Sequence, residues 1–230
     1  MHSASMRRFA LFGLLLAVVA ALPVSAQEGR MPLFGKVRNK VYTGPSGAYR
    51  IALPVLSELG GTISDSEYVV VFQDQFTIHI TIACFKQDPT QRWEYSTRGP
   101  KEYFRYFFSS YVFPDLQQSY AGITVENENF DPKYLDGAWF INTLLPGGTM
   151  FMHRLAEPAP GAPPPVAKRG NLLFVKHGHV YVISTELAER LTEGHTYKLT
   201  AEEENNLIRE RLEGIVNLMD FVRPPADGPR

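Results

Sequence analysis

Residues 76–86 read FTIHITIACFK, a run that alternates bulky apolar residues with smaller or polar ones. Because successive side chains of a strand point to opposite faces, one face of this strand has His79 and the other is an apolar stripe of Phe76, Ile78, Ile80, Ile82 and Cys84. The pattern predicts a strand with one face in a core. Cys84 is therefore predicted to be a buried, inert thiol that His79 cannot activate.

Similar runs before and after this stretch indicate several further strands. We predict them at residues 49–53, 67–73, 123–125, 138–145, 149–155, 171–176 and 179–185. Asp74-Gln75 and His177-Gly178 lie between neighbouring runs and predict tight hairpin turns. Most connections are short, which favours an antiparallel sheet.

Two stretches have helical spacing. Gly99-Pro100 is predicted to open a helix, because proline at the first turn costs no hydrogen bond. Its core-facing stripe is Phe104, Phe107, Phe108 and Tyr111.

The second helix is predicted near the C-terminus. Thr200 and Glu203 have the spacing of a capping box. A long amphipathic helix is predicted to follow, with its stripe at Ile208, Leu212, Ile215, Met219 and Val222, ended by Pro224-Pro225.

Together these elements predict an α+β fold, an antiparallel sheet with helices packed on it in an α/β/α-type sandwich. We predict one domain over residues 42–224, after a leader at residues 27–41 that is strapped over the domain or flexible. Residues 156–168 are rich in proline and predict a solvated loop within the domain. Residues 225–230 are predicted to form a flexible tail.

The first 26 residues have the pattern of a cleavable secretory signal. Arg7 and Arg8 precede an uncharged apolar run at residues 9–22, and residues 24–26 fit a signal-peptidase site. The run is shorter than the roughly 20 apolar residues that span a bilayer. We therefore predict cleavage near Ala26, a periplasmic or extracellular location, and no membrane span.

Loss of the signal changes the charge balance. The chain has 23 basic and 24 acidic residues; the signal removes Arg7 and Arg8 and no acid, so 21 and 24 remain. This mild acidity, with no basic run, argues against nucleic acid as a partner. Cys84 is the only cysteine, so an intramolecular disulfide is excluded.

The order of elements resembles a known superfamily of small sandwiches. The resemblance rests on residues 49–54 (YRIALP), 173–183 (LFVKHGHVYVI) and 212–221 (LEGIVNLMDF), and it spans residues 42–224 apart from the proline-rich loop. The superfamily includes the PsbP-type extrinsic subunit of photosystem II, the Ran-binding nuclear import factor and secreted bacterial proteins. It implies a binding or accessory module and supplies no residue-level motif.

Two groups of residues are candidates for a site. The first is four aromatic residues, Trp93, Tyr95, Tyr103 and Tyr106, which could stack on sugars or anchor a protein partner, or else complete the core. The second is three histidines, His153, His177 and His179, which could hold zinc or copper, or else be ordinary turn residues.

No catalytic motif accompanies these groups. The chain has no Gly-x-Ser-x-Gly elbow, no phosphate-binding loop and no His-Glu-x-x-His. The acidic run at residues 202–204 suits a helix N-terminus and not a catalytic carboxylate pair. We expect no catalytic residues, no cofactor, and a non-enzymatic binding domain that contacts another envelope protein. The alternative is a metal- or glycan-handling periplasmic protein, possibly with hydrolase activity.

Overall fold

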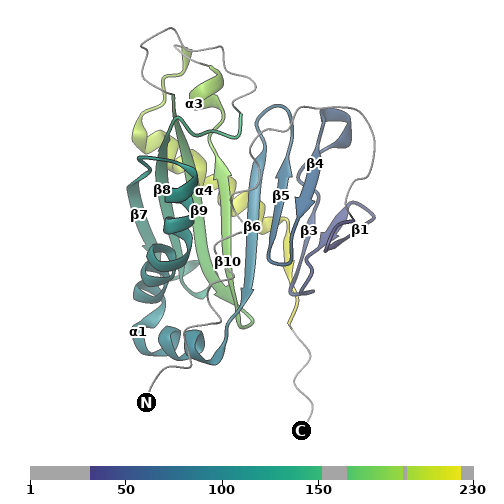
Figure 1. Cartoon of the computed structure of the whole chain (residues 1–230), viewed down its shortest axis with the longest axis vertical. Coiled ribbons are helices and arrows are strands. Elements are labelled where there is room, and N and C mark those ends of the chain that lie inside the picture. Colours follow the sequence, from purple (N-terminus) through teal and green to yellow (C-terminus); the bar gives the residue numbers. More distant parts are fainter. Residues whose placement is uncertain (1–31, 152–164, 194–195, 224–230) are drawn as a thin grey trace.

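The computed structural model describes residues 32–151, 165–193 and 196–223, and these form an α+β fold with two antiparallel sheets (Figure 1). The larger sheet has seven strands in the order β4 (Thr62–Asp65), β5 (Val69–Gln73), β6 (His79–Lys86), β10 (His179–Glu186), β9 (Val166–Lys176), β8 (Ala138–Pro146) and β7 (Thr124–Asp131). The smaller sheet has four short strands in the order β1 (Lys36–Arg38), β2 (Val41–Thr43), β3 (Tyr49–Ala52) and β11 (Met219–Phe221).

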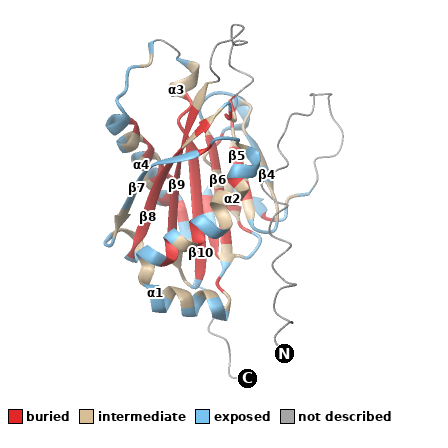
Figure 2. Ribbon diagram, turned by 60° about the vertical axis from the view of Figure 1, so that its left-hand side comes forward, coloured by how far each residue is buried: buried red, intermediate tan, exposed pale blue. Residues whose placement is uncertain are grey.

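The large sheet separates two hydrophobic cores, so both of its faces are covered and its central strands are buried (Figure 2). On one face Ile82 and Cys84 of β6 pack with residues of the small sheet and of helix α4 (Ala201–Asn217). On the other face Ala83 packs with helix α1 (Pro89–Phe107). The predicted burial of Cys84 is confirmed, since its exposed fraction is 5%.

The hairpin before β6 is longer than predicted. Strand β6 begins at His79, and Asp74 organises the preceding loop by accepting hydrogen bonds from the backbone N–H groups of Phe76, Thr77 and Ile78. This side-chain turn replaces the tight turn expected at Asp74-Gln75. The stripe of β6 therefore starts at Ile80.

Helix α1 begins ten residues before the predicted helix start at Gly99. Asp88 and Gln91 form a capping box, and Pro89 occupies the first turn. The helix is kinked at Gly99, whose φ of 75° is easily adopted only by glycine. The predicted start is thus a kink between two helical arms.

A π-helical turn, η2 (Phe108–Val112), links α1 to helix α2 (Phe113–Ser119). The predicted stripe is confirmed at Phe104, Phe107 and Phe108, which are buried against the large sheet.

The C-terminal helix α4 has the predicted capping box, with Thr200 and Glu203 exchanging hydrogen bonds. Its stripe is buried at Ile208, Leu212 and Ile215. The long helix expected to continue toward Val222 is not present. The helix ends at Asn217, and Met219–Phe221 instead pairs with β3 as strand β11.

Several predicted boundaries also differ. Within the predicted leader, β1 and the start of β2 are strands of the small sheet. Within the predicted loop at residues 156–168, β9 already begins at Val166. Of the strand expected at residues 149–155, residues 149–151 are in no strand and the rest lies outside the described residues.

The predicted signal (residues 1–26) and tail (225–230) also lie outside the described residues. Three further elements are short: the 3-10 turns η1 (Ser57–Leu59) and η3 (Tyr134–Asp136) and helix α3 (Glu189–Thr192). Among the residues that the structure describes, no helix has the length and apolar character needed to cross a membrane.

Candidate binding cleft

One carboxylate joins the two sheets at the open side of the sandwich. Asp65, the last residue of β4, accepts hydrogen bonds from the Tyr42 hydroxyl at 2.7 Å and from the backbone N–H groups of Phe34 and Gly35 at 2.9 and 2.8 Å. Burial, and then the bond to Asp65, raise the pKa of Tyr42 well above its usual value. The segment before β1 is therefore fixed to the edge of the large sheet.

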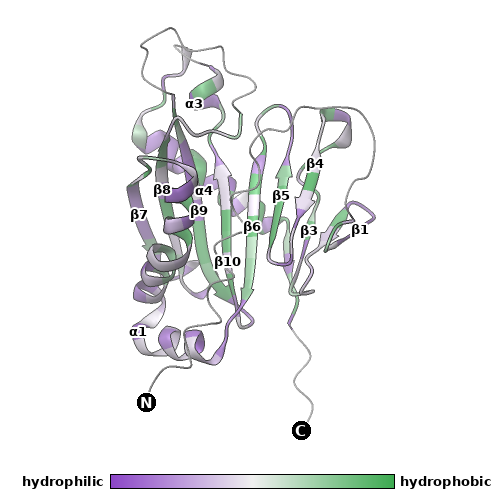
Figure 3. Ribbon diagram, in the orientation of Figure 1, coloured by the Kyte–Doolittle hydropathy of each residue, from purple (hydrophilic) through white to green (hydrophobic). Residues whose placement is uncertain are grey.

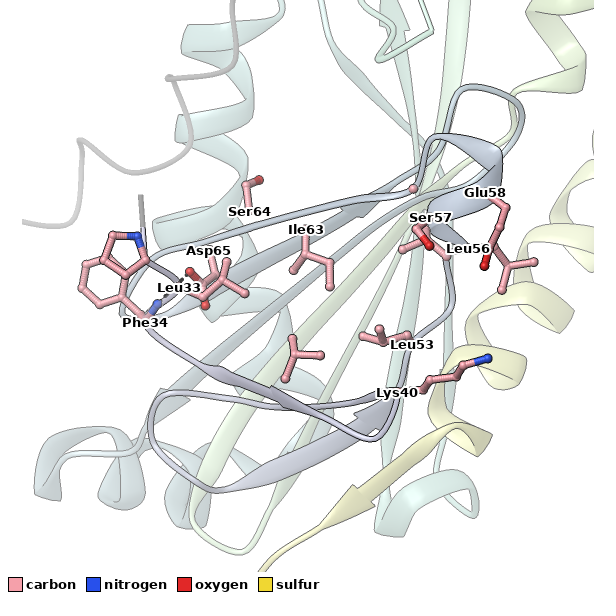
Figure 4. A pocket seen from close by; sticks show the side chains of 14 residues that line it. Leu33, Phe34, Lys40, Leu53, Leu56, Ser57, Glu58, Ile63, Ser64 and Asp65 are labelled. Carbon is pink, nitrogen blue, oxygen red and sulfur yellow. Dashed lines mark hydrogen bonds between the residues drawn. The ribbon is translucent and has the colours of Figure 1, made fainter. Parts of the chain in front are cut away.

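Beside this corner the sheets diverge and leave an open cleft of about 930 Å³. Figure 4 shows that Ile63 of β4 and Leu53, which follows β3, project into it, with Phe34 at one end and Leu56 at the other. Most lining side chains are aliphatic or aromatic. The cleft is an extension of the core between the two sheets. At this place no other side chain of the described residues covers its lining.

Several lining side chains are exposed although they are apolar. The exposed fractions are 64% for Phe34, 52% for Leu56 and 40% for Val37. Single exposed apolar residues are common, but a contiguous group around a concavity is typical of a surface that binds something. Burial of apolar area contributes about 25 cal/mol per Å², so covering these side chains would favour association.

The charged side chains of the cleft lie at its ends. Lys40 and Glu58 are at one end and Asp65 is at the other (Figure 4). Lys40 lies in the two-residue turn between β1 and β2, where it and Asn39 have φ values of 61° and 50°, as in the tight turns that suit hairpins. Together with Lys36 and Arg38, Lys40 makes this hairpin basic.

The four predicted aromatic residues do not form one exposed surface. Tyr103 is fully buried and packs edge-on against Tyr95 at 5.2 Å between ring centroids. Tyr106 bonds through its hydroxyl to Tyr111. Trp93, on the first arm of α1, is 61% exposed. Of the four, Trp93 is thus the ring most available to a partner, and a contact through it stays a prediction.

Two of the three predicted histidines lie at the β9–β10 hairpin. His177 lies in the turn with a φ of 50°, and His179 begins β10 with its Nδ1 atom 3.1 Å from the His177 carbonyl oxygen. His153 lies outside the described residues. Among residues 32–151, 165–193 and 196–223, no cluster of three or more His, Cys, Asp or Glu side chains could hold a metal ion.

The structure contains a buried polar row that the sequence did not suggest as a site. This row crosses neighbouring strands of the large sheet near one end and consists of Gln73, His79, Glu186, Arg169 and Thr143. Burial and then the charge of Arg169 lower the pKa of His79 to about 3, so the ring is neutral. Glu186 is fully buried, and burial raises its pKa.

A second buried group joins β9 to α4. Lys168 is fully buried and donates to Glu204 at 3.0 Å, and Arg190 and Tyr197 also donate to that carboxylate. Burial alone would raise the pKa of Glu204, but these donors outweigh it and lower the pKa. Lys168 also pairs with Glu126 of β7, so the charges of this group are satisfied within the fold. Removal of one partner would leave a buried charge unpaired and is expected to destabilise the protein.

Sequence reasoning missed the cleft because its walls come from segments without strand or helix periodicity. Leu33, Phe34 and Val37 lie in what was predicted to be a leader, and Leu56 lies in the connection after β3. One signal was present: a leader that is only a solvated spacer has no reason to carry three bulky apolar residues within five positions. Those residues point to a wall of a binding surface.

No protein-family model matches the chain, and no curated protein matches its sequence. The chain is similar in structure to the Ran-binding protein Mog1p of Saccharomyces cerevisiae, with 12% identity, a TM-score of 0.46, and coverage of 81% of this chain and 97% of that one. It is also similar to cyanobacterial PsbP (CyanoP) of Synechocystis sp. PCC 6803, with 10% identity, a TM-score of 0.46, and coverage of 87% and 99%. These are the two kinds of protein that the sequence pattern resembles.

Proposed function

We propose that this protein is an exported, non-enzymatic binding domain that contacts another protein of the cell envelope through the cleft between its two sheets. The observation that carries the proposal is the open apolar cleft, in which Phe34, Val37 and Leu56 are exposed around a volume of about 930 Å³. The signal-like pattern of residues 1–26 supports export to the periplasm or the extracellular space.

The chemistry of the cleft suits a protein partner. Its lining is mostly apolar, and its charged side chains Lys40, Glu58 and Asp65 lie at the ends, which is the usual arrangement of a protein interface. The most buried ionisable groups, Lys168, Glu186 and Glu204, lie elsewhere and serve the core.

Site-specific photo-crosslinking in intact cells tests the proposal. A photoreactive amino acid is placed at Val37 in β1, and, as a control, at Val125 in β7. Both are valines on edge strands, with exposed fractions of 40% and 44%. We expect one adduct of defined mass in the envelope fraction from position 37, and none from position 125.

A second pair of variants shows whether the adduct depends on the cleft. Leu56→Asp places a charge in the cleft, and Leu218→Asp places one at a similarly exposed site after α4. Leu56→Asp is expected to abolish the adduct at position 37, and Leu218→Asp is expected to leave it. The proposal is wrong if the adduct forms equally from both crosslinker positions, if it survives Leu56→Asp, or if the signal is retained in a cytoplasmic protein.

A further inference from the structure

The large sheet has two edge strands, and they differ in how they meet solvent. Strand β7 is interrupted by a bulge between Val125 and Asn127 and carries Glu126 and Glu128 on its exposed length. Bulges and charges are the usual devices that prevent a strand edge from pairing with another chain. Strand β7 is mostly hydrophilic in Figure 3, whereas β4 and β5 have hydrophobic segments.

Strand β4, at the other edge, has no bulge and borders the cleft. Its one charged residue is Asp65, whose carboxylate already accepts hydrogen bonds from Tyr42, Phe34 and Gly35. In the part of the chain that the structure describes, it pairs with β5 and with no other strand. The backbone N–H of Ser66 donates to Val69. Because hydrogen-bonded pairs alternate in an antiparallel ladder, Ser64 and Thr62 also bond to β5. The backbone groups of Ile63 and Asp65 consequently point away from β5, toward the open edge.

Ile63 and Asp65 also present their side chains to the cleft. Their partners in β5 are Phe72 and Val70, which face the core between the two sheets, and directly paired residues have their side chains on the same face. The Phe34 and Gly35 N–H groups bond to the Asp65 carboxylate and not to its backbone. Among the residues that the structure describes, the edge of β4 therefore offers peptide groups without a backbone partner directly beside apolar side chains. That combination is the requirement for adding a strand from another chain.

The charge near the cleft indicates what flanks such a strand. The β1–β2 hairpin contributes Val37 and Lys40 to the opposite wall. Lys36 and Arg38 alternate with Val37 and are exposed on the outer face of the hairpin, and no acidic residue lies between positions 36 and 43. Glu58 faces only the Lys40 end of the cleft (Figure 4). A partner segment with acidic residues beside its apolar core would complement this hairpin.

We propose that the cleft binds an extended segment of the partner protein, which pairs with the outer edge of β4, inserts apolar side chains at alternate positions and faces the β1–β2 hairpin with acidic residues. This inference rests on the proposed function and specifies its mode of binding. Main-chain hydrogen bonds to Ile63 and Asp65 would supply affinity, and the cleft would select the side chains.

The test uses a panel of synthetic octapeptides with Val, Leu, Ile or Phe at alternate positions, Thr or Ser between them, and two Glu residues at one end. Hydrogen exchange of the full mature protein is followed by NMR with and without peptide. We expect the amides of Ile63 and Asp65 to become at least tenfold more protected. The amide of Ser64, already bonded to β5, serves as the internal control and is expected to change little.

Backbone N-methylation of the best peptide separates strand pairing from simple apolar contact. Methylation at one alternate set of residues is expected to weaken binding at least tenfold, and methylation at the other set is expected to be tolerated.

Charge reversal in the protein tests the role of the β1–β2 hairpin. The double variant Lys36→Glu/Arg38→Glu is expected to bind the peptide more weakly and with less dependence on salt. Lys101→Glu on α1 is expected to leave both the affinity and its salt dependence unchanged.

Four outcomes would overturn the inference: no peptide of the panel binds, binding leaves the Ile63 and Asp65 amides unprotected, both methylation sets are tolerated, or the protein alone forms dimers that Val37→Asp dissociates. The last outcome would assign the cleft to a second copy of this chain. An envelope adduct at position 37 without amide protection would leave the proposed function standing and remove only the strand-pairing mode.

Discussion

The hydroxyl of Tyr42 lies 2.7 Å from Oδ2 of Asp65, and this contact joins the small sheet to the edge of the large one. Tyr42 is fully buried, and its ring packs edge-on against Phe72 of β5 at 5.6 Å between centroids. The position of the cleft wall thus depends on one phenol and one carboxylate.

Tyr42→Phe is expected to lower the free energy of unfolding by about 1–3 kcal/mol, because a hydrogen bond to a charged group contributes about that much. Urea denaturation measures the loss. Tyr134→Phe is the matched control, since the Tyr134 hydroxyl is buried without a hydrogen-bond partner among the described residues. An equal loss in both variants would contradict the role assigned to Asp65.

Gly170→Ala tests the close approach of β9 to α4. A Cβ atom at Gly170 would overlap Cγ2 of Ile208, so the helix must move away. Such overpacking typically costs about 1–3 kcal/mol of stability. The Gly170→Ala/Ile208→Ala double variant is expected to lose less stability than the two single losses added together, which chemical denaturation would show.

The matched control for that experiment is Gly214→Ala in α4. An added Cβ there meets nothing within 4 Å. Since alanine is favoured over glycine in helices by about 1 kcal/mol, this variant is expected to be slightly more stable. A loss at Gly214 as large as that at Gly170 would show that steric overlap is not the cause.

His79 is expected to make the fold sensitive to acid. Burial and Arg169 lower its pKa to about 3, below the value of about 6.5 in an unfolded chain. Between these values the unfolded state binds the proton and the folded state does not, so stability is complete above pH 6.5 and falls as the pH drops toward 3. From pH 7 to pH 4 this amounts to a loss of about 3 kcal/mol.

Urea denaturation at several pH values measures this effect. His79→Leu is expected to lose less stability on acidification than the unmodified protein. His177→Gln, at the partly exposed hairpin turn, is the control and is expected to follow the unmodified protein. If the free energy of unfolding falls equally in His79→Leu and in the unmodified protein from pH 7 to pH 4, His79 is not the cause of the acid sensitivity.

Cys84 is expected to react with a thiol reagent only when the protein unfolds. Burial raises its pKa to about 11, although hydrogen bonds with Tyr181 and Ser46 act in the opposite direction. The labelling rate at pH 8 should therefore match the rate of global opening and rise steeply with urea. A Gln117→Cys variant on the exposed side of α2 supplies the fast-reacting reference.

The sequence predicted the elements that repeat a pattern over many residues. The alternation of β6 and the stripe of α1 were readable because bulky apolar residues recur at the period of the element. The capping box of α4 was readable because it depends only on two residues three positions apart. In the small sheet only β3 was predicted in this way, as the strand at residues 49–53. Its other strands have three residues each, too few to show a period, and their pairing depends on residues far apart in the chain.

The candidate site was less predictable than the fold. The sequence left open whether the aromatic residues near α1 bind a partner or complete the core, and Tyr103 is buried in the core whereas Trp93 is exposed. The cleft combines β4, the segment at residues 32–40 and the connection after β3. Only the three-dimensional arrangement brings these together, since no local rule relates Phe34 to Asp65.

The pairing of β3 with β11 has a consequence for how the chain matures. Tyr49 lies opposite Phe221, and Ile51 lies opposite Met219, so about 170 residues separate the two halves of one ladder. Such distant contacts form late, because the intervening loop must be ordered first. A nascent chain that stops short of Met219 lacks this strand, leaving Tyr49 and Ile51 without cover. The domain therefore acquires this part of its core surface only after residues 219–221 have been synthesised, so the Tyr49 and Ile51 side of β3 stays available to a chaperone until then.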